Sequence, residues 1–165
     1  GVGYKRRMAP LGALLADVDL DYLADYNRLK RHNVGRLDAE LGDVPGIAIA
    51  RPSREAVRGG FYQGYPIQLL GDRVSRATVL RTLKAEGIDA APYPFPLHHR
   101  LRVYTDPAYR HQVLTGRSTT PTSRPEVSLP VTERLADRLM LLAPRYLLTL
   151  NQTTLNTLRT ILSAL

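Results

Sequence analysis

A chain of 165 residues is the size of one compact domain, and its apolar share of 44% excludes a disordered or collagen-like protein. The absence of cysteine excludes disulfides and thiolate metal sites and fits a cytoplasmic protein, and the sequence has no apolar run long enough to span a membrane. The net charge of +8 rests on 20 Arg and three Lys, dispersed along the chain without a nucleic-acid-reading motif, which leaves nucleic-acid binding a minority hypothesis.

The first predicted element is a helix that runs from Pro10 to Leu41, a length of ~45 Å. Proline suits the first turn of a helix, and apolar side chains recur at spacings of three and four residues along its first half. They are Leu11, Leu15, Val18, Tyr22, Tyr26 and Leu29. Because this helix is too long for a small globule, we expect part of it to pack against another body. The Gly-Asp-Val-Pro-Gly segment at residues 42–46 ends it.

Short strands alternate with helices after residue 46. The predicted strands cover residues 47–50, 61–70 and 88–91, and the predicted helices run from Ser75 to Gly87, from Val131 to Leu142 and from Asn151 to the C-terminus. We expect Thr132 to cap the second of these helices. Pro66 predicts an edge position or a bulge for its strand, and residues 105–125 are predicted to be mostly loop. This alternation predicts an α/β fold in which helices cover a small sheet of three or four strands.

Six short motifs follow one another along the chain. They are Gly3-Tyr4-Lys5-Arg6-Arg7-Met8, Pro45-Gly46-Ile47, Phe61-Tyr62…Tyr65, Leu83-Lys84-Ala85-Glu86-Gly87-Ile88, Tyr93-Pro94…Pro96-Leu97-His98 and Leu129-Pro130-Val131-Thr132-Glu133-Arg134-Leu135-Ala136. In this order and at these distances they resemble the C-terminal portion of the pyridoxal-phosphate sugar aminotransferases of the DegT/DnrJ/EryC1/StrS family. The chain departs from the family pattern at Arg6, where the family has Tyr, and at Asp19, where it has Gln.

The resemblance implies the small domain of an aspartate-aminotransferase-like fold (fold type I). Residues 1–41 would be a connecting helix with a cofactor-facing N-terminal segment, and residues 42–165 a small C-terminal α/β domain. The implied activity is that of an oligomeric transferase that binds pyridoxal phosphate and moves an amino group onto a keto-sugar. In the family, the lysine that forms the internal aldimine lies upstream of this region. We therefore expect no catalytic residue here, and a cofactor shared with a partner chain and not bound covalently by this one.

The surroundings of the three lysines agree with that expectation. A lysine that holds pyridoxal phosphate needs a desolvated pocket that lowers its pKa. Lys30 lies among basic neighbours on a helix face that we expect to be solvated, and Lys84 lies on the exposed side of a predicted helix. Lys5 has Arg6 and Arg7 beside it, and like-charge repulsion lowers a lysine pKa, but the resemblance places Lys5 at a cofactor phosphate. Alone, the chain is not expected to transaminate.

Four residues are the candidate ligand contacts. Lys5 and Arg7 precede the long helix, where cations beside backbone N–H groups suit a phosphate, and the resemblance places Lys5 at the phosphate of a neighbouring subunit's cofactor. Tyr93 and His98 lie in a loop stiffened by three prolines, which the resemblance places near the sugar-binding mouth. The alternatives are solvated cations and exposed loop residues. No histidine has a partner at metal-ligand spacing, so no metal site is expected.

Two hypotheses of different classes stay open. In the first, the chain is the small-domain half of an aminotransferase and needs a large-domain half, on a separate polypeptide or on the rest of the same gene product. Gly1 in place of Met fits a chain that is processed, tagged or cut from a longer one. In the second, it is an inactive subunit that docks on an intact aminotransferase and stabilises or modulates it. We expect the first half of the long helix and the last helix to expose apolar stripes unless a partner covers them.

Overall fold

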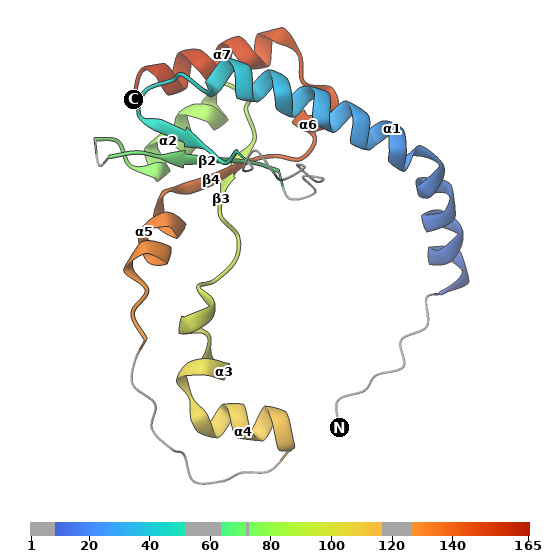
Figure 1. Ribbon diagram of the computed structural model, residues 1–165, viewed down its shortest axis with the longest axis vertical. Coiled ribbons are helices and arrows are strands. Elements are labelled where there is room, and N and C mark those ends of the chain that lie inside the picture. Colours follow the sequence, from blue (N-terminus) through green and yellow to red (C-terminus); the bar gives the residue numbers. More distant parts are fainter. Residues whose placement is uncertain (1–8, 52–63, 72, 117–126) are drawn as a thin grey trace.

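The sheet at the centre of the molecule has four antiparallel strands in the order β1-β2-β4-β3 (Figure 1). The computed structural model describes residues 9–51, 64–71, 73–116 and 127–165. The strands are β1 Ile47–Ile49, β2 Tyr65–Leu69, β3 Ala90–Pro92 and β4 Leu139–Leu142. The helices are α1 Pro10–Leu41, α2 Arg76–Ala85, α3 Arg102–Thr105, α4 Pro107–Thr115, α5 Pro130–Arg138, α6 Tyr146–Thr149 and α7 Gln152–Ser163, with the 3-10 helix η1 at His98–Arg100. The predicted α/β fold with a long N-terminal helix is confirmed.

The hydrophobic core lies between the sheet and the helices α1, α2, α6 and α7. Buried and half-buried residues alternate along β2, which is the pattern of a sheet covered on one face. The helices contribute the buried side chains of Val34, Leu37, Leu41, Val79, Leu83, Leu147, Leu155, Leu158 and Leu162. Residues 93–116, here called the arm, extend from this body on the side away from α7, and α5 lies beside the start of the arm (Figure 1).

The helix α1 is continuous over 32 residues, but only its second half belongs to the core. Its buried residues are Asn33, Val34, Leu37 and Leu41. Asn33 donates Nδ2 to the carbonyl oxygen of Leu147 at 3.0 Å, and Arg36 donates Nη1 to that of Leu150 at 2.9 Å. The first half projects from the body and exposes its large apolar side chains (Figure 1). The exposed stripe predicted for this half of the helix is therefore confirmed.

The exposed stripe predicted for the last helix is wrong. The helix α7 begins after Asn151 as predicted, because Asn151 Oδ1 accepts the backbone N–H of Thr154 at 2.8 Å. Its regularly spaced leucines are all buried: Leu155, Leu158 and Leu162. Arg159 attaches the helix to the turn after α1 by donating Nη1 and Nη2 to the two carboxylate oxygens of Asp43, at 2.9 and 3.1 Å. The domain thus covers α7 with its own residues.

The helix predicted over residues 131–142 is shorter than expected, with nine residues from Pro130 to Arg138. The helix α5 ends at Arg138, and the next four residues form β4, an inner strand of the sheet. A short apolar run such as Leu139–Leu142 carries no periodicity that separates helix from buried strand, and pairing on both sides decides in favour of the strand. Thr132 does not cap the helix. The N-cap residue is Leu129, whose side chain makes no cap hydrogen bond, and Pro130 lies in the first turn.

The position of β2 corrects the expectation for Pro66 in part. The strand is an inner strand, with β1 on one side and β4 on the other, and Pro66 pairs with Leu141. The register joins β1 to Ile67, Gln68 and Leu69, so Pro66 lies one residue past the end of that pairing. A proline has no backbone N–H to donate to a neighbouring strand. Because Pro66 lies beyond the residues that pair with β1, no such donor is needed there.

Part of the segment predicted as loop is helical. The helix α4 covers Pro107–Thr115 and begins after Asp106, whose Oδ1 accepts the N–H of Tyr109 at 3.0 Å. It ends at Gly116, which has a φ of 70°, the left-handed conformation that favours glycine. An Asp followed by Pro is a helix start signal that the sequence analysis did not use. Residues 117–126 of the same segment lie outside the described residues.

Candidate functional site

The first residues of the arm carry the aromatic part of the candidate site. Tyr93 directly follows β3 and donates its backbone N–H to the carbonyl oxygen of Leu139 at 3.3 Å, which continues the contact between β3 and β4. Its ring meets that of Phe95 edge to face, with centroids 5.4 Å apart and an interplanar angle of 64°. Both rings are more than a third exposed. The fold therefore holds the backbone of Tyr93 and leaves its ring available for contact with a ligand or a partner.

The two adjacent histidines of the arm have different environments. His98 begins η1 and is exposed. His99 turns inward: its side chain is 9% exposed, and its Nε2 lies 2.9 Å from Oε1 of Glu133 in α5. The alternative of a simply exposed loop residue therefore does not hold for His99. Anchoring the loop through His99 leaves the neighbouring imidazole of His98 free to face outward.

Glu133 joins the arm to the start of α5, and we call this set of contacts the Glu133 clamp. Its Oε1 accepts from His99 and, at 3.2 Å, from the backbone N–H of Leu129, while its Oε2 lies 2.8 Å from Nη2 of Arg100. The hydrogen bond from His99, then that from the Leu129 N–H, lowers the pKa of the Glu133 carboxyl below its usual value, and the charge of Arg100 adds to the effect. The carboxylate is therefore charged at neutral pH and has three donors.

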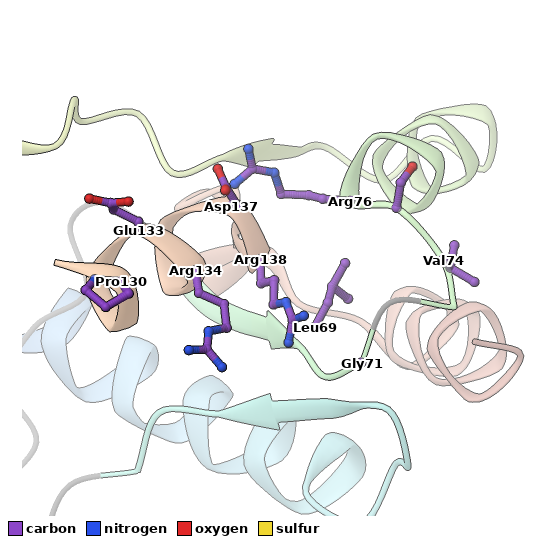
Figure 2. Close-up of a pocket in the computed structure, with 10 residues that line it drawn as sticks. Leu69, Gly71, Val74, Arg76, Pro130, Glu133, Arg134, Asp137 and Arg138 are labelled. Carbon is purple, nitrogen blue, oxygen red and sulfur yellow. The ribbon is translucent and has the colours of Figure 1, made fainter. Parts of the chain in front are cut away.

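A groove of about 600 Å3 opens beside α5, between this helix, the end of β2 and the start of α2, and Glu133 is among its lining residues. Figure 2 shows Arg134 and Arg138 on the face of α5 that turns toward Leu69, and Glu133 and Asp137 on the opposite face. Arg76 reaches from α2 to the end of α5, where its Nη1 donates to the carbonyl oxygens of Ala136 and, at 3.0 Å, of Leu139. Three arginines (Arg76, Arg134 and Arg138) and two carboxylates (Glu133 and Asp137) line the groove beside the apolar Leu69 and Val74.

The structure places two of the four predicted ligand contacts. Tyr93 lies at the start of the arm and His98 five residues later, both exposed; the contacts of the described residues do not join the two side chains. Lys5 and Arg7 lie outside the described residues. The roles of His99 and Glu133 were not predicted from the sequence, although Glu133 lies within one of the six motifs and His99 directly follows the motif that ends at His98. Their contact joins residues 34 positions apart, which no local pattern reveals.

Two of the three lysines lie in the described residues: Lys30 is half-buried on α1 and Lys84 is exposed on α2. Within the described ranges no group of three His, Asp or Glu side chains is placed to hold a metal ion. Nor does any helix in those ranges combine the length and apolar character needed to cross a bilayer.

Comparison with known proteins relates both the sequence and the fold of this chain to aminotransferases. The sequence model of the DegT/DnrJ/EryC1/StrS aminotransferase family matches residues 1–140. The fold is similar to that of the aminotransferase TlmJ from Streptoalloteichus hindustanus, with a TM-score of 0.70 at 20% identity over 99% of this chain and 38% of that one. A DegT DnrJ EryC1 StrS aminotransferase from Brucella abortus gives 0.67 at 19% identity, over 99% of this chain and 39% of that one.

A third similar structure contains the cofactor. It is the GDP-4-keto-6-deoxy-D-mannose-3-dehydratase of E. coli with bound hydrated PLP, with a TM-score of 0.64 at 15% identity over 98% of this chain and 37% of that one. At these identities the likeness establishes the fold. The chain spans less than two fifths of the length of each of the three proteins.

Proposed function

This chain belongs to the DegT/DnrJ/EryC1/StrS aminotransferase family, and we propose that it forms the C-terminal part of a pyridoxal-phosphate-dependent aminotransferase that transfers an amino group to a keto-sugar-like acceptor. It acts together with a large-domain half, on the same polypeptide or on another, that supplies the lysine to which the cofactor is bound. The observation that carries this proposal is the family match over residues 1–140 in a chain that corresponds to only about 38% of a similar aminotransferase.

The environments of the described lysines support the need for a second half. Lys30 lies among Arg28 and Arg31 on α1 and is half-buried, and Lys84 is exposed on α2. A lysine that binds pyridoxal phosphate covalently lies in a desolvated pocket. The covalent attachment point therefore belongs to another part of the complete enzyme.

The proposed contribution of this chain is to bind and to orient. Lys5 and Arg7, a few residues before the start of α1, are proposed to contact the cofactor phosphate, for which charge-assisted hydrogen bonds are well suited. Tyr93 and His98 are proposed to contact the acceptor. The Glu133 clamp supports this role, because it ties the backbone next to His98 to α5 while both candidate side chains stay exposed. The complete oligomer is proposed to be cytoplasmic.

A test of the first proposal identifies the chain that carries the cofactor. The native complex is purified through a tag on this chain, incubated with pyridoxal phosphate and reduced with borohydride, and the modified lysine is located by peptide mass spectrometry. We expect the label on a lysine of large-domain sequence and none on this chain purified alone. The Lys84→Ala variant is the matched control and keeps the label. A label on Lys30 or Lys84 would contradict the proposal.

The second candidate function is that of an inactive subunit that docks on an intact aminotransferase. The observation that favours it is the exposed Asp19 of α1 at a position where the family pattern has Gln, together with Arg6 in place of Tyr. Titrating the chain into a purified intact aminotransferase of the same family distinguishes the two. A change in activity or stability without any change in cofactor content favours the docking subunit. Cofactor content that depends on this chain, and falls in the Lys5→Ala variant, favours the shared active site.

A further inference from the structure

The groove beside α5 has the size and the charges of a small-molecule site. Its volume of about 600 Å3 lies within the range of about 300–1,000 Å3 that is usual for ligand sites. Tyr93 and His98, the described candidates for contact with the acceptor, are not among its lining residues. We propose that the groove binds a phosphate ester, with the phosphate group on Arg134 and Arg138 and the organic part of the ligand against Val74.

Arg134 and Arg138 form the cationic side of the groove. They are four residues apart on α5, a spacing at which helical side chains are neighbours with Cβ atoms about 5–6 Å apart. Figure 2 shows both on the face of α5 that turns toward Leu69. Two like charges at this spacing destabilise a helix. An anion bound between them reduces that repulsion, and the planar guanidinium fork matches two phosphate oxygens at once.

The guanidinium group of Arg134 is available to a ligand. The side chain is exposed, and it has no ion pair or hydrogen bond within the part of the chain that the structure describes. The two carboxylates of α5 that line the groove do not replace a ligand as its partner. Both oxygens of Glu133 already accept donors in the Glu133 clamp, and Figure 2 shows Asp137 on the opposite face of the helix from Arg134.

Arg76 gives the groove a further positive charge, which the fold holds in place. Its Nη1 donates to the carbonyl oxygens of Ala136 and, at 3.0 Å, of Leu139, so this guanidinium group has a fixed position. Arg76 is also the first residue of α2, and the N-cap residue Ser75 lines the groove beside it. The first N–H groups of a helix carry a partial positive charge, and α2 has no acidic side chain in its first turn to offset it. An anion in the groove therefore lies among positive groups from two helices.

Apolar side chains at the two ends of the groove favour a ligand with an organic part. Pro130 at the start of α5 is exposed, and Val74 before α2 is half-buried. Figure 2 shows the two arginines of α5 between them. A free phosphate ion would leave both apolar side chains in water, whereas the organic group of an ester removes Val74 from water when its phosphate is on the arginines. The groove thus fits a phosphate ester better than the ion alone.

Titration with phenyl phosphate tests the site and the class of its ligand. The chain is labelled with nitrogen-15, and NMR follows its backbone amides and the Nε–H groups of its arginines. We expect saturable shifts at Ser75, Arg76, Arg134 and Arg138, and affinities for inorganic phosphate and for benzoate that are lower by about threefold or more. No saturable shift at these residues would overturn the proposal. An equal affinity for inorganic phosphate would overturn the ester, and an equal affinity for benzoate would overturn the phosphate.

Paired charge removal tests the two arginines. The variant Arg134→Gln/Arg138→Gln is compared with Arg31→Gln/Arg81→Gln, which removes the same charge from two exposed side chains outside the groove. We expect the first to weaken binding of phenyl phosphate by about tenfold or more, and the control by less than about twofold. Equal weakening would mean a general effect of net charge and would overturn the site. Arg134→Gln alone removes an exposed side chain without a polar partner in the described ranges, so the fold is retained; unchanged affinity in this variant would also overturn the site.

Two further comparisons separate the groove from other phosphate sites. If Lys5→Ala abolishes binding of phenyl phosphate and the groove variant does not, the phosphate belongs to the segment proposed for the cofactor and the groove proposal is wrong. If a DNA oligonucleotide displaces phenyl phosphate from the groove and binds more tightly, the groove takes a nucleic-acid backbone and the small-molecule proposal is wrong. If the native complex holds no pyridoxal phosphate while phenyl phosphate binds at the groove, the groove stands and the enzymatic proposal fails.

Discussion

The two halves of α1 are alike in sequence and differ in environment. Both carry large apolar side chains at helical spacing, yet Leu37 is fully buried and Leu15 is 59% exposed. The second half also has polar anchors, since Asn33 and Arg36 donate to main-chain carbonyls around α6. Periodicity in the sequence thus identifies an apolar face, whereas the residues that cover this face depend on how much of the assembly is present. One half of α1 belongs to this domain, and the other half has the features of an interface.

The largest difference is expected when one leucine is shortened in each half. Leu37→Ala removes methyl groups from the core and should lower the free energy of unfolding by about 2–5 kcal/mol. Leu15→Ala should change it by no more than about 0.5 kcal/mol, because the side chain is already in water. Urea unfolding monitored by circular dichroism measures both. A large loss for Leu15→Ala in the isolated chain would mean that the exposed half has a cover of its own.

The buried hydrogen bond of Asn33 tests the same difference between the two halves of α1, with a smaller expected effect. Asn33→Ala leaves the carbonyl of Leu147 without its donor in a buried place, and should cost about 1–3 kcal/mol. Asn27→Ala, in the first half of the helix and half-buried, is the matched control and should cost less than about 0.5 kcal/mol. Thermal unfolding of the three proteins under one condition is sufficient. Equal losses of stability in the two variants would show that the helix propensities of Asn and Ala, and not the hydrogen bond from Asn33 to Leu147, determine the effect.

The segment before the exposed half is expected to affect the cofactor and not the fold. Lys5→Ala should weaken retention of pyridoxal phosphate by the complex by about 1–3 kcal/mol, the range for losing a charge-assisted hydrogen bond. Lys30→Ala, nearer the buried half, should leave retention unchanged. Equilibrium dialysis of the complex measures both. Unchanged retention in Lys5→Ala would remove this residue from the cofactor site.

The smallest effect concerns the arm and depends on pH. Because hydrogen bonds lower the pKa of Glu133 in the folded chain, its contribution is present above the ordinary carboxyl value of about 4.3. It is lost as the pH falls through the lowered value, when the carboxylate takes up a proton. Glu133→Gln should remove this dependence and speed amide exchange of Leu101, in the segment that the Glu133 clamp holds, with little change in the core. Hydrogen exchange between pH 3 and pH 7 tests this; an unchanged rate at Leu101 would show that the Glu133 clamp does not hold the arm.

The sequence predicts best those elements whose ends have a local signal. Pro10 starts α1, Ser75 and Asn151 cap their helices through their own side chains, and the family motifs locate Tyr93 and His98. It fails where tertiary pairing decides. Leu139–Leu142 has a composition that suits helix or strand, and becomes an inner strand because β2 and β3 lie on either side.

In the candidate site, too, the sequence predicts the local elements and does not predict the contacts between distant segments. The positions of the loop and of α5 follow from motifs, but the pairing of His99 with Glu133 depends on how the arm packs against α5. Adjacent histidines look equivalent in a sequence, since nothing local tells which imidazole turns inward. The Glu133 clamp therefore emerges only when the two segments are placed side by side.

The unbroken course of α1 has a mechanical consequence. The helix continues through both halves over 32 residues, and its second half is fixed to the domain by Asn33 and Arg36. From Asn33 to Leu11 the axis is about 33 Å long, at about 1.5 Å per residue. A tilt of the domain by about 5° then moves the far end by about 3 Å. The helix therefore acts as a lever that couples the orientation of the small domain to any body that binds the N-terminal end of α1.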